Sequence, residues 1–146
     1  MILVSPANTL AGFTLEFFIE EQMTQDEQIQ YLANIYYLAR ADKDFQVEED
    51  YLLQDIAKGI GAGYLETRKA LDLSMTGDFK IKLPISLSDR IRNLEDMLMV
   101  AYYDKTLQEM EKKIITAYAK HLDITKEQFE TIKQEVKKRL QDRTKP

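Results

Sequence analysis

The sequence predicts an all-α protein of about seven helices, and three observations support this fold class. Apolar residues recur at helical spacing through most of the chain, two motifs mark helix starts, and one stretch resembles a second stretch 62 positions later. We interpret residues 1–146 as a single compact domain with two pseudo-repeated helix-loop-helix halves, at about 25–73 and 87–141, joined by a connector at 74–86.

Capping signals and apolar spacing place the helices along the chain. Thr24 with Glu27, and Thr125 with Gln128, match the capping box, in which side chain and backbone of the first turn bond to each other. From these signals we predict helices at residues 9–22, 25–41, 47–60, 63–73, 87–102, 107–121 and 125–141.

Two segments interrupt the helical pattern. Gly59, Gly61 and Gly63 end the predicted third helix, because a helix C-terminus often needs a residue that adopts positive φ. The connector instead has a period of two, with apolar side chains at Phe79, Ile81, Leu83 and Ile85. Because a lone strand has no ladder partner in a helical protein, we expect an extended connector that lays these side chains on the core.

The two halves of the chain resemble each other. At a shift of 62, residues 29–58 show nine identities over 30 positions, where about two are expected for unrelated chains of ordinary composition. The shared residues include Asp42 with Asp104 and Glu49 with Glu111. We interpret this as an internal duplication around one core, because the unit is longer than a stacking repeat and occurs only twice.

Composition excludes several classes of protein. The chain has 146 residues, of which 45% are hydrophobic and 31% charged, as in an ordinary globular protein. Without cysteine there is no disulfide framework or thiol nucleophile, and the lack of a signal peptide or long apolar run predicts a cytoplasmic protein with no direct membrane insertion. Residues 1–72 hold 13 acidic and 5 basic side chains, which predicts that nucleic acid is not a partner.

Each half contains an Asp and a Glu seven residues apart at a corner between helices. If Gln46 and Gln108 are N-caps, Glu49 and Glu111 fall at the third helical position, where a carboxylate accepts from the N-cap amide. We therefore favour a structural role, in which these residues tie the corner.

The first corner also has a functional interpretation. It concentrates five carboxylates in nine residues, and we name as candidate metal ligands Asp42, Asp44, Glu48, Glu49 and Asp50. Oxygen clusters of this kind suit calcium or magnesium. Val47 and Leu53 stand where an EF-hand loop has its glycine and its bidentate Glu, so we expect weak binding and not a high-affinity loop of that type.

The corners carry a family resemblance. Residues 38–49, Leu-Ala-Arg-Ala-Asp-Lys-Asp-Phe-Gln-Val-Glu-Glu, and 103–111 resemble the acidic signature of the TerB-like family, with Lys43 and Lys105 in place of its glycine. The resemblance covers about residues 25–140. It implies an all-helical domain linked to tellurite and stress resistance, with suspected metal binding, membrane-bound partners and no catalytic activity.

Other candidate features have bland interpretations that we prefer. His121 is the only histidine and is expected to be a capping or surface residue, so Ser-His-Asp catalysis is not predicted; catalysis by carboxylates alone stays open. Tyrosine and methionine side chains either line a partner groove or, as we favour, pack in the core: Tyr36, Tyr37, Tyr102, Tyr103, Met97, Met99 and Met110. The basic last helix is expected to be a solvated end, although acidic lipid is an alternative.

Together these features predict a non-enzymatic TerB-like domain in tellurite or stress resistance. It would act through protein partners and weak calcium or magnesium binding at the first corner. The alternative is a metal-independent, self-associating adaptor, a possible homodimer, that uses the aromatic predicted first helix with Leu10, Phe13, Phe17 and Phe18.

Overall fold

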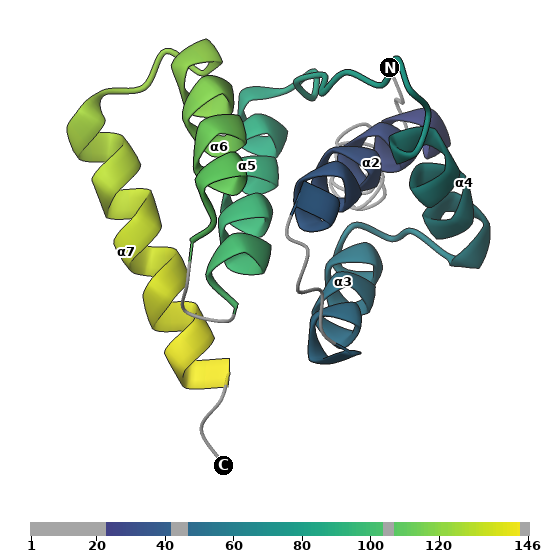
Figure 1. The fold of residues 1–146 in the computed structure, drawn as a ribbon, viewed down its shortest axis with the longest axis horizontal. Coiled ribbons are helices and arrows are strands. Elements are labelled where there is room, and N and C mark those ends of the chain that lie inside the picture. Colours follow the sequence, from purple (N-terminus) through teal and green to yellow (C-terminus); the bar gives the residue numbers. More distant parts are fainter. Residues whose placement is uncertain (1–22, 42–46, 104–106, 144–146) are drawn as a thin grey trace, which may run out of the picture.

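The computed structural model describes residues 23–41, 47–103 and 107–143, with residues 47–49 described by their backbone alone. Figure 1 shows that these ranges form helices and loops, with no strand. The helices are α2 (Gln25–Ala41), α3 (Val47–Gly59), α4 (Tyr64–Ser74), α5 (Leu87–Tyr102), α6 (Glu109–His121) and α7 (Lys126–Arg143).

The all-helical prediction is confirmed for the described residues. Their six helices begin and end within two residues of the predicted bounds. The predicted helix at 9–22 lies outside the described residues, so the count of seven helices stays a prediction. The helix starts also repeat, because α5, α6 and α7 begin 62 positions after α2, α3 and α4 respectively.

Both predicted capping boxes are confirmed. The backbone N–H of Glu27 donates to Thr24 Oγ1 at 3.2 Å, and the Thr24 N–H donates back to Glu27 Oε1 at 3.1 Å. Thr125 and Gln128 make the same reciprocal pair at 3.0 and 2.8 Å. Each box satisfies backbone donors that the helix itself leaves unpaired, so local sequence sets where α2 and α7 begin.

The prediction for the glycines is correct in part. Gly59 is the last residue of α3, and Gly61 has φ of 80° in the turn that follows. Gly63, however, belongs to the next helix as the N-cap of α4, with φ of −101°, and its N–H donates to Glu66 Oε1 at 2.7 Å. Only Gly61 therefore needs the conformational freedom of glycine.

A single hydrophobic cluster receives side chains from all six described helices. In Figure 1, α2, α3 and α4 lie on one side, and α5, α6 and α7 on the other. Six successive residues of α2, Tyr31–Tyr36, are buried, because α2 packs against α4, α5 and α6. A helix buried on all sides holds polar residues only where they have partners, which makes α2 the place to look for a polar site.

The connector between the halves is extended, as predicted, but its last apolar residue is wrongly placed. Phe79, Ile81 and Leu83 are partly buried against the core, whereas Ile85 is 77% exposed. The alternation ends there because the chain bends to enter α5, whose N-cap Ser86 accepts from the N–H of Asp89 at 3.1 Å. The prediction assumed that the connector stays straight to its end.

Candidate functional site

Most side chains of the predicted acidic corner lie outside the part of the chain that the structure describes. Asp42 and Asp44 lie outside the described residues, and the side chains of Glu48 and Glu49, in the first turn of α3, do so too. Asp50 is exposed. Among the residues that are described, no three His, Cys, Asp or Glu side chains gather into a group able to hold a metal ion. The metal site therefore stays a prediction.

In the second corner Asp104 lies outside the described residues, but Glu111 makes the predicted structural tie. The Gln108 N–H donates to Glu111 Oε1 at 3.0 Å in a capping box, and the Glu111 side chain is 1% exposed. Leu107, in front of it, is partly buried and packs against the core. The structural interpretation of the shared Glu is thus confirmed for Glu111.

A buried polar cluster, which the sequence did not predict, joins α2 to α5. Asn34 and Asn93 are both fully buried, and Asn34 Nδ2 donates to Asn93 Oδ1 at 2.9 Å. Asn93 Nδ2 donates to the Tyr31 carbonyl at 3.2 Å, and the Tyr118 hydroxyl donates to Asn93 Oδ1 at 3.2 Å. These amides bond to each other, to Tyr118 and to the backbone within the core, so the cluster holds helices together and offers little to a ligand.

Asn34 also supplies the ladder partner that the connector was expected to lack. Its Nδ2 donates to the Lys82 carbonyl at 2.8 Å, and the Lys82 N–H donates to its Oδ1 at 3.3 Å. A side-chain amide presents a donor and an acceptor as a neighbouring strand does. One buried asparagine therefore fixes both the α2·α5 contact and the path of the connector.

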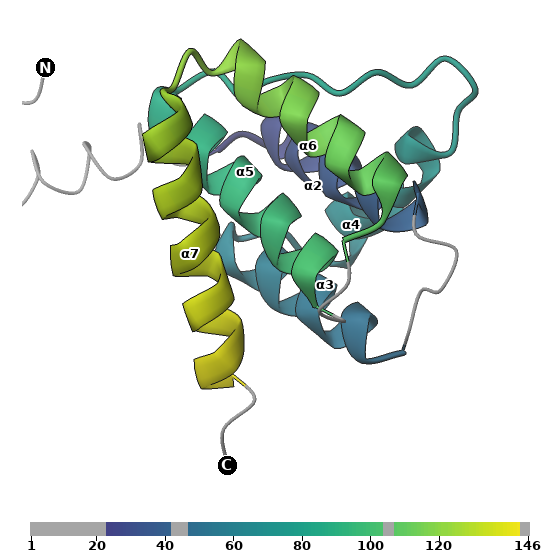
Figure 2. The same cartoon turned by 60° about the vertical axis from the view of Figure 1, so that its left-hand side comes forward.

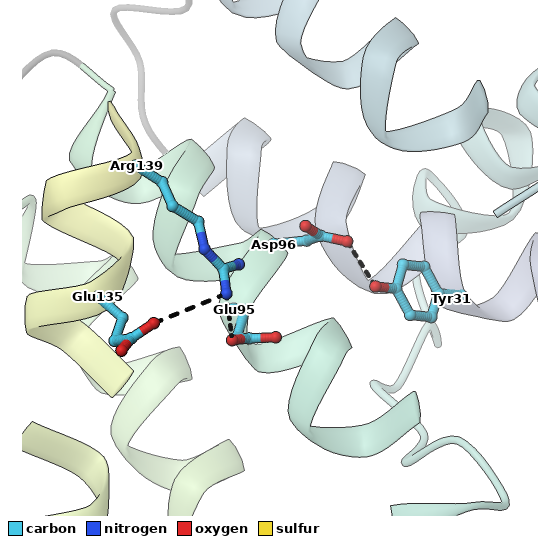
Figure 3. Close-up of polar contacts among 5 residues, drawn as sticks. All are labelled: Tyr31, Glu95, Asp96, Glu135 and Arg139. Carbon is cyan, nitrogen blue, oxygen red and sulfur yellow. Dashed lines mark hydrogen bonds and ion pairs between the residues drawn. The ribbon is translucent and has the colours of Figure 1, made fainter. Parts of the chain in front are cut away.

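Beside this cluster, Figure 3 shows the carboxyl group of Asp96 facing the Tyr31 hydroxyl, which donates to Oδ2 at 2.5 Å. Burial raises the pKa of Asp96 to about 6, although the Tyr31 hydrogen bond and Arg92 oppose this rise. Burial, together with the Asp96 charge, also raises the pKa of Tyr31. Arg139 is nearby but bonds Glu95 at 3.2 Å. Asp96 thus holds a proton more readily than an ordinary carboxyl group.

The two pairs across α2 and α5 are reciprocal. Residue 93 is 62 positions after 31, and 96 is 62 after 34. Tyr31 bonds Asp96, which is the counterpart of Asn34. Asn34 in turn bonds Asn93, which is the counterpart of Tyr31. Reciprocal contacts of this kind are the mark of a two-fold axis. This pattern, read at the duplicated spacing, is the signal that would have pointed to the cluster from the sequence.

A groove lies between the connector and α6. It has a volume of about 350 Å³ and is lined mostly by apolar side chains, namely those of Tyr37, Phe79, Ile81, Leu83, Ile114, Ala117 and Tyr118, with Lys80 and His121. The Tyr37 and Phe79 rings, 5.2 Å between centroids, lie side by side in it. No carboxylate lines the groove, so its charge is cationic. Figure 2 shows α6 crossing over α2 beside the connector.

The outer face of α6 continues the cationic surface. A shallow hollow of about 400 Å³ shares Ala117 and His121 with the groove and is lined by Lys112, Lys113 and Lys120, with Glu109 as its one acid. His121 is exposed, as predicted, yet it borders both hollows. We call the groove and this face together the α6 groove.

The last turns of α7 are exposed, as predicted, but some of their basic side chains also contact neighbouring helices. Arg143 bonds Asp55 of α3 at 2.7 Å, and Lys137 lies 4.9 Å from the centre of the Tyr102 ring. With the Arg139–Glu95 pair these contacts attach α7 to its neighbours. These contacts are compatible with an exposed helix end, because a long cationic side chain can lie along a neighbouring helix while its charge stays at the surface.

Most of the tyrosine and methionine side chains singled out in the sequence pack in or against the core, and two of them are exposed. Tyr36 and Met97 are in the core, and Tyr102, Tyr103 and Met99 pack partly buried against it, as favoured. Tyr37 and Met110 are 39% and 54% exposed. Of these two, Tyr37 lines the α6 groove.

Comparisons with known proteins identify no relative. No family model matches the chain, and the searches of the curated proteins and of the solved structures returned no match. The resemblance to TerB-like proteins thus rests on the two short corner motifs. None of the described helices has the length and apolar character needed to cross a membrane.

Proposed function

We propose that the chain is a non-enzymatic domain that binds protein partners through the α6 groove. The single observation that carries this proposal is the open, apolar groove of about 350 Å³ with cations at its rim. Its volume is at the low end of the range for ligand sites, about 300–1,000 Å³. The most buried polar side chains, by contrast, are occupied with each other in the core.

Free positive charge at the rim supports this choice of surface. Lys80, Lys113 and Lys120 are exposed, and none of them forms an ion pair with another described residue. Arg139 and Arg143 of α7 differ from these lysines, because they bond acids on neighbouring helices. Unpaired cations beside apolar surface favour a partner that is both acidic and apolar.

A photo-crosslinking amino acid at Ala117 in the full chain tests the proposal. It should crosslink to specific proteins in the native host, and the same probe at Gln134, on the exposed side of α7, should not. With a purified partner, Ala117→Arg should weaken binding about ten-fold or more, whereas Gln134→Arg, which adds the same charge elsewhere, should leave it unchanged. Equal effects at the two positions would refute the proposal.

A second candidate function is that of a TerB-like protein. In this case the chain would act in the cytoplasm in tellurite or stress resistance and would bind calcium or magnesium weakly. What favours it is the concentration of acids in the first corner, which the second corner lacks: Thr106, Met110 and Lys112 replace Asp44, Glu48 and Asp50. The two candidates are compatible, because the corner and the α6 groove use different residues.

A further inference from the structure

We infer that the α6 groove takes the N-terminal segment, residues 9–22, of a second copy of this chain. The inference rests on the proposed function, since it names a partner for the same groove. It also gives the aromatic segment, which lies outside the described residues, a specific place to bind.

The chemistry of the segment complements the groove. Residues 1–22 contain Glu16, Glu20 and Glu21 but neither lysine nor arginine, and they include Phe13, Phe17 and Phe18. At the helical spacing that the sequence predicts, Phe13 and Phe17 share one face with acids on both flanks. The groove presents the opposite arrangement, because its apolar floor is bordered by Lys80 on the connector and by Lys113 and Lys120 on α6.

We favour the segment of a second copy as the occupant of the groove, and not the segment of the same chain, because of the place where the segment joins α2. Met23 lies at the start of α2, in a separate hollow with Gly59 and Arg92, whereas Tyr37 marks the groove 12 residues beyond the first residue of α2. That separation is about 18 Å along the helix. α2 packs against α4, α5 and α6, so a segment of the same chain would have to pass over these packed helices to reach the groove. The segment of a second copy can instead approach the groove from its open side.

Two copies that exchange their segments would form a closed pair. Each groove would receive the segment of the other chain, which is the reciprocal arrangement of a two-fold dimer. Both contacts pair acids with lysines at an exposed rim, so association should weaken as salt rises from about 50 mM to 500 mM. Salt dependence thus separates this dimer from one held by apolar contacts alone.

Sedimentation of the full chain over a range of concentrations tests the inference. The chain should dimerise, and Ala117→Arg and Phe17→Ser should each raise the dissociation constant about ten-fold or more. Gln134→Arg is the matched control and should behave as the natural chain. A chain that is monomeric throughout, or a dimer that both variants leave intact, would overturn the inference.

A charge exchange tests the pairing directly. A chain with Lys113→Glu and Lys120→Glu, and another with Glu16→Lys and Glu21→Lys, should each be monomeric alone but should form a mixed dimer when combined. Failure to restore the dimer would also overturn the inference. The proposed function would survive that failure if Ala117 still crosslinks to a different protein, and it would fail together with the inference if Ala117 crosslinks to no protein.

Discussion

The half formed by α2, α3 and α4 and the half formed by α5, α6 and α7 use matched positions, 62 residues apart, for different chemistry. At one matched pair, Asn34 is a fully buried amide, whereas Asp96 is a carboxyl group with a pKa raised to about 6. At another, Gly61 and Asp123 both adopt positive φ, of 80° and 60°. The helix starts recur in both halves, but these matched positions hold different side chains: a buried amide in the first half and a titratable carboxyl group in the second.

The comparison can be broken most strongly at Asn34. Asn34→Ala removes the partner of both the Asn93 amide and the Lys82 backbone, so it should lower the free energy of unfolding by about 3–5 kcal/mol. Urea denaturation measures this loss. Asp96→Ala, at the matched position, should cost less because that side chain is only partly buried. Equal losses would mean that the two positions have the same structural role.

Asp96 should make stability depend on pH. Its folded pKa, about 6, exceeds its ordinary value of 3.8, so its contribution is fully present below pH 3.8 and is lost as pH rises through 6. The loss at neutral pH should approach about 3 kcal/mol. Asp96→Asn should therefore stabilise the protein at pH 7 and flatten the profile between pH 4 and about 7. Asp72→Asn, an exposed control, should leave the profile unchanged.

Metal binding at the predicted site should have a smaller effect on stability, and it should occur at the first corner but not at the second. At a calcium concentration ten times the dissociation constant, a ligand of the folded state alone raises stability by about 1.4 kcal/mol. Asp42→Asn with Asp44→Asn should abolish this gain, whereas Asp104→Asn, in the matched corner, should not. Thermal unfolding at millimolar calcium or magnesium measures it. An unchanged melting temperature in the natural chain would remove the site.

The smallest expected effect concerns the two turns with positive φ. Asp123→Gly should stabilise the protein by about 0.5–1 kcal/mol, because glycine adopts this conformation without the steric cost of a Cβ atom. Gly61→Ala should destabilise it by about 1 kcal/mol for the converse reason. Thermal unfolding of the two variants decides between this interpretation and one in which the Asp123 side chain itself stabilises the turn.

The helices were predictable because their signals are local. The capping boxes at Thr24 and Thr125, and the spacing of apolar residues, act within a turn or two of the chain, and the structure places the described helices as predicted. The exposure of Ile85 and the contacts of Arg139 and Arg143 were not predictable. They depend on a bend at the entry to α5 and on which acids neighbouring helices present.

The candidate site was less predictable than the fold. The acids of the first corner attracted attention because they are close in sequence. The side chains that line the α6 groove come from α2, the connector and α6, which are separated by up to 84 residues from Tyr37 to His121. No local pattern marks such a set, because each residue is ordinary by itself.

By itself, the sequence determined the helical class, the positions of the described helices and the spacing of 62 at which they restart, since capping and apolar periodicity are short-range effects. Only the tertiary structure decided that Asn34 meets Asn93, that Tyr31 meets Asp96, and that the connector and α6 leave a groove bordered by lysines that pair with no described acid. The pKa of Asp96 follows from the same cause, because burial is a property of the packed helices and not of the residue.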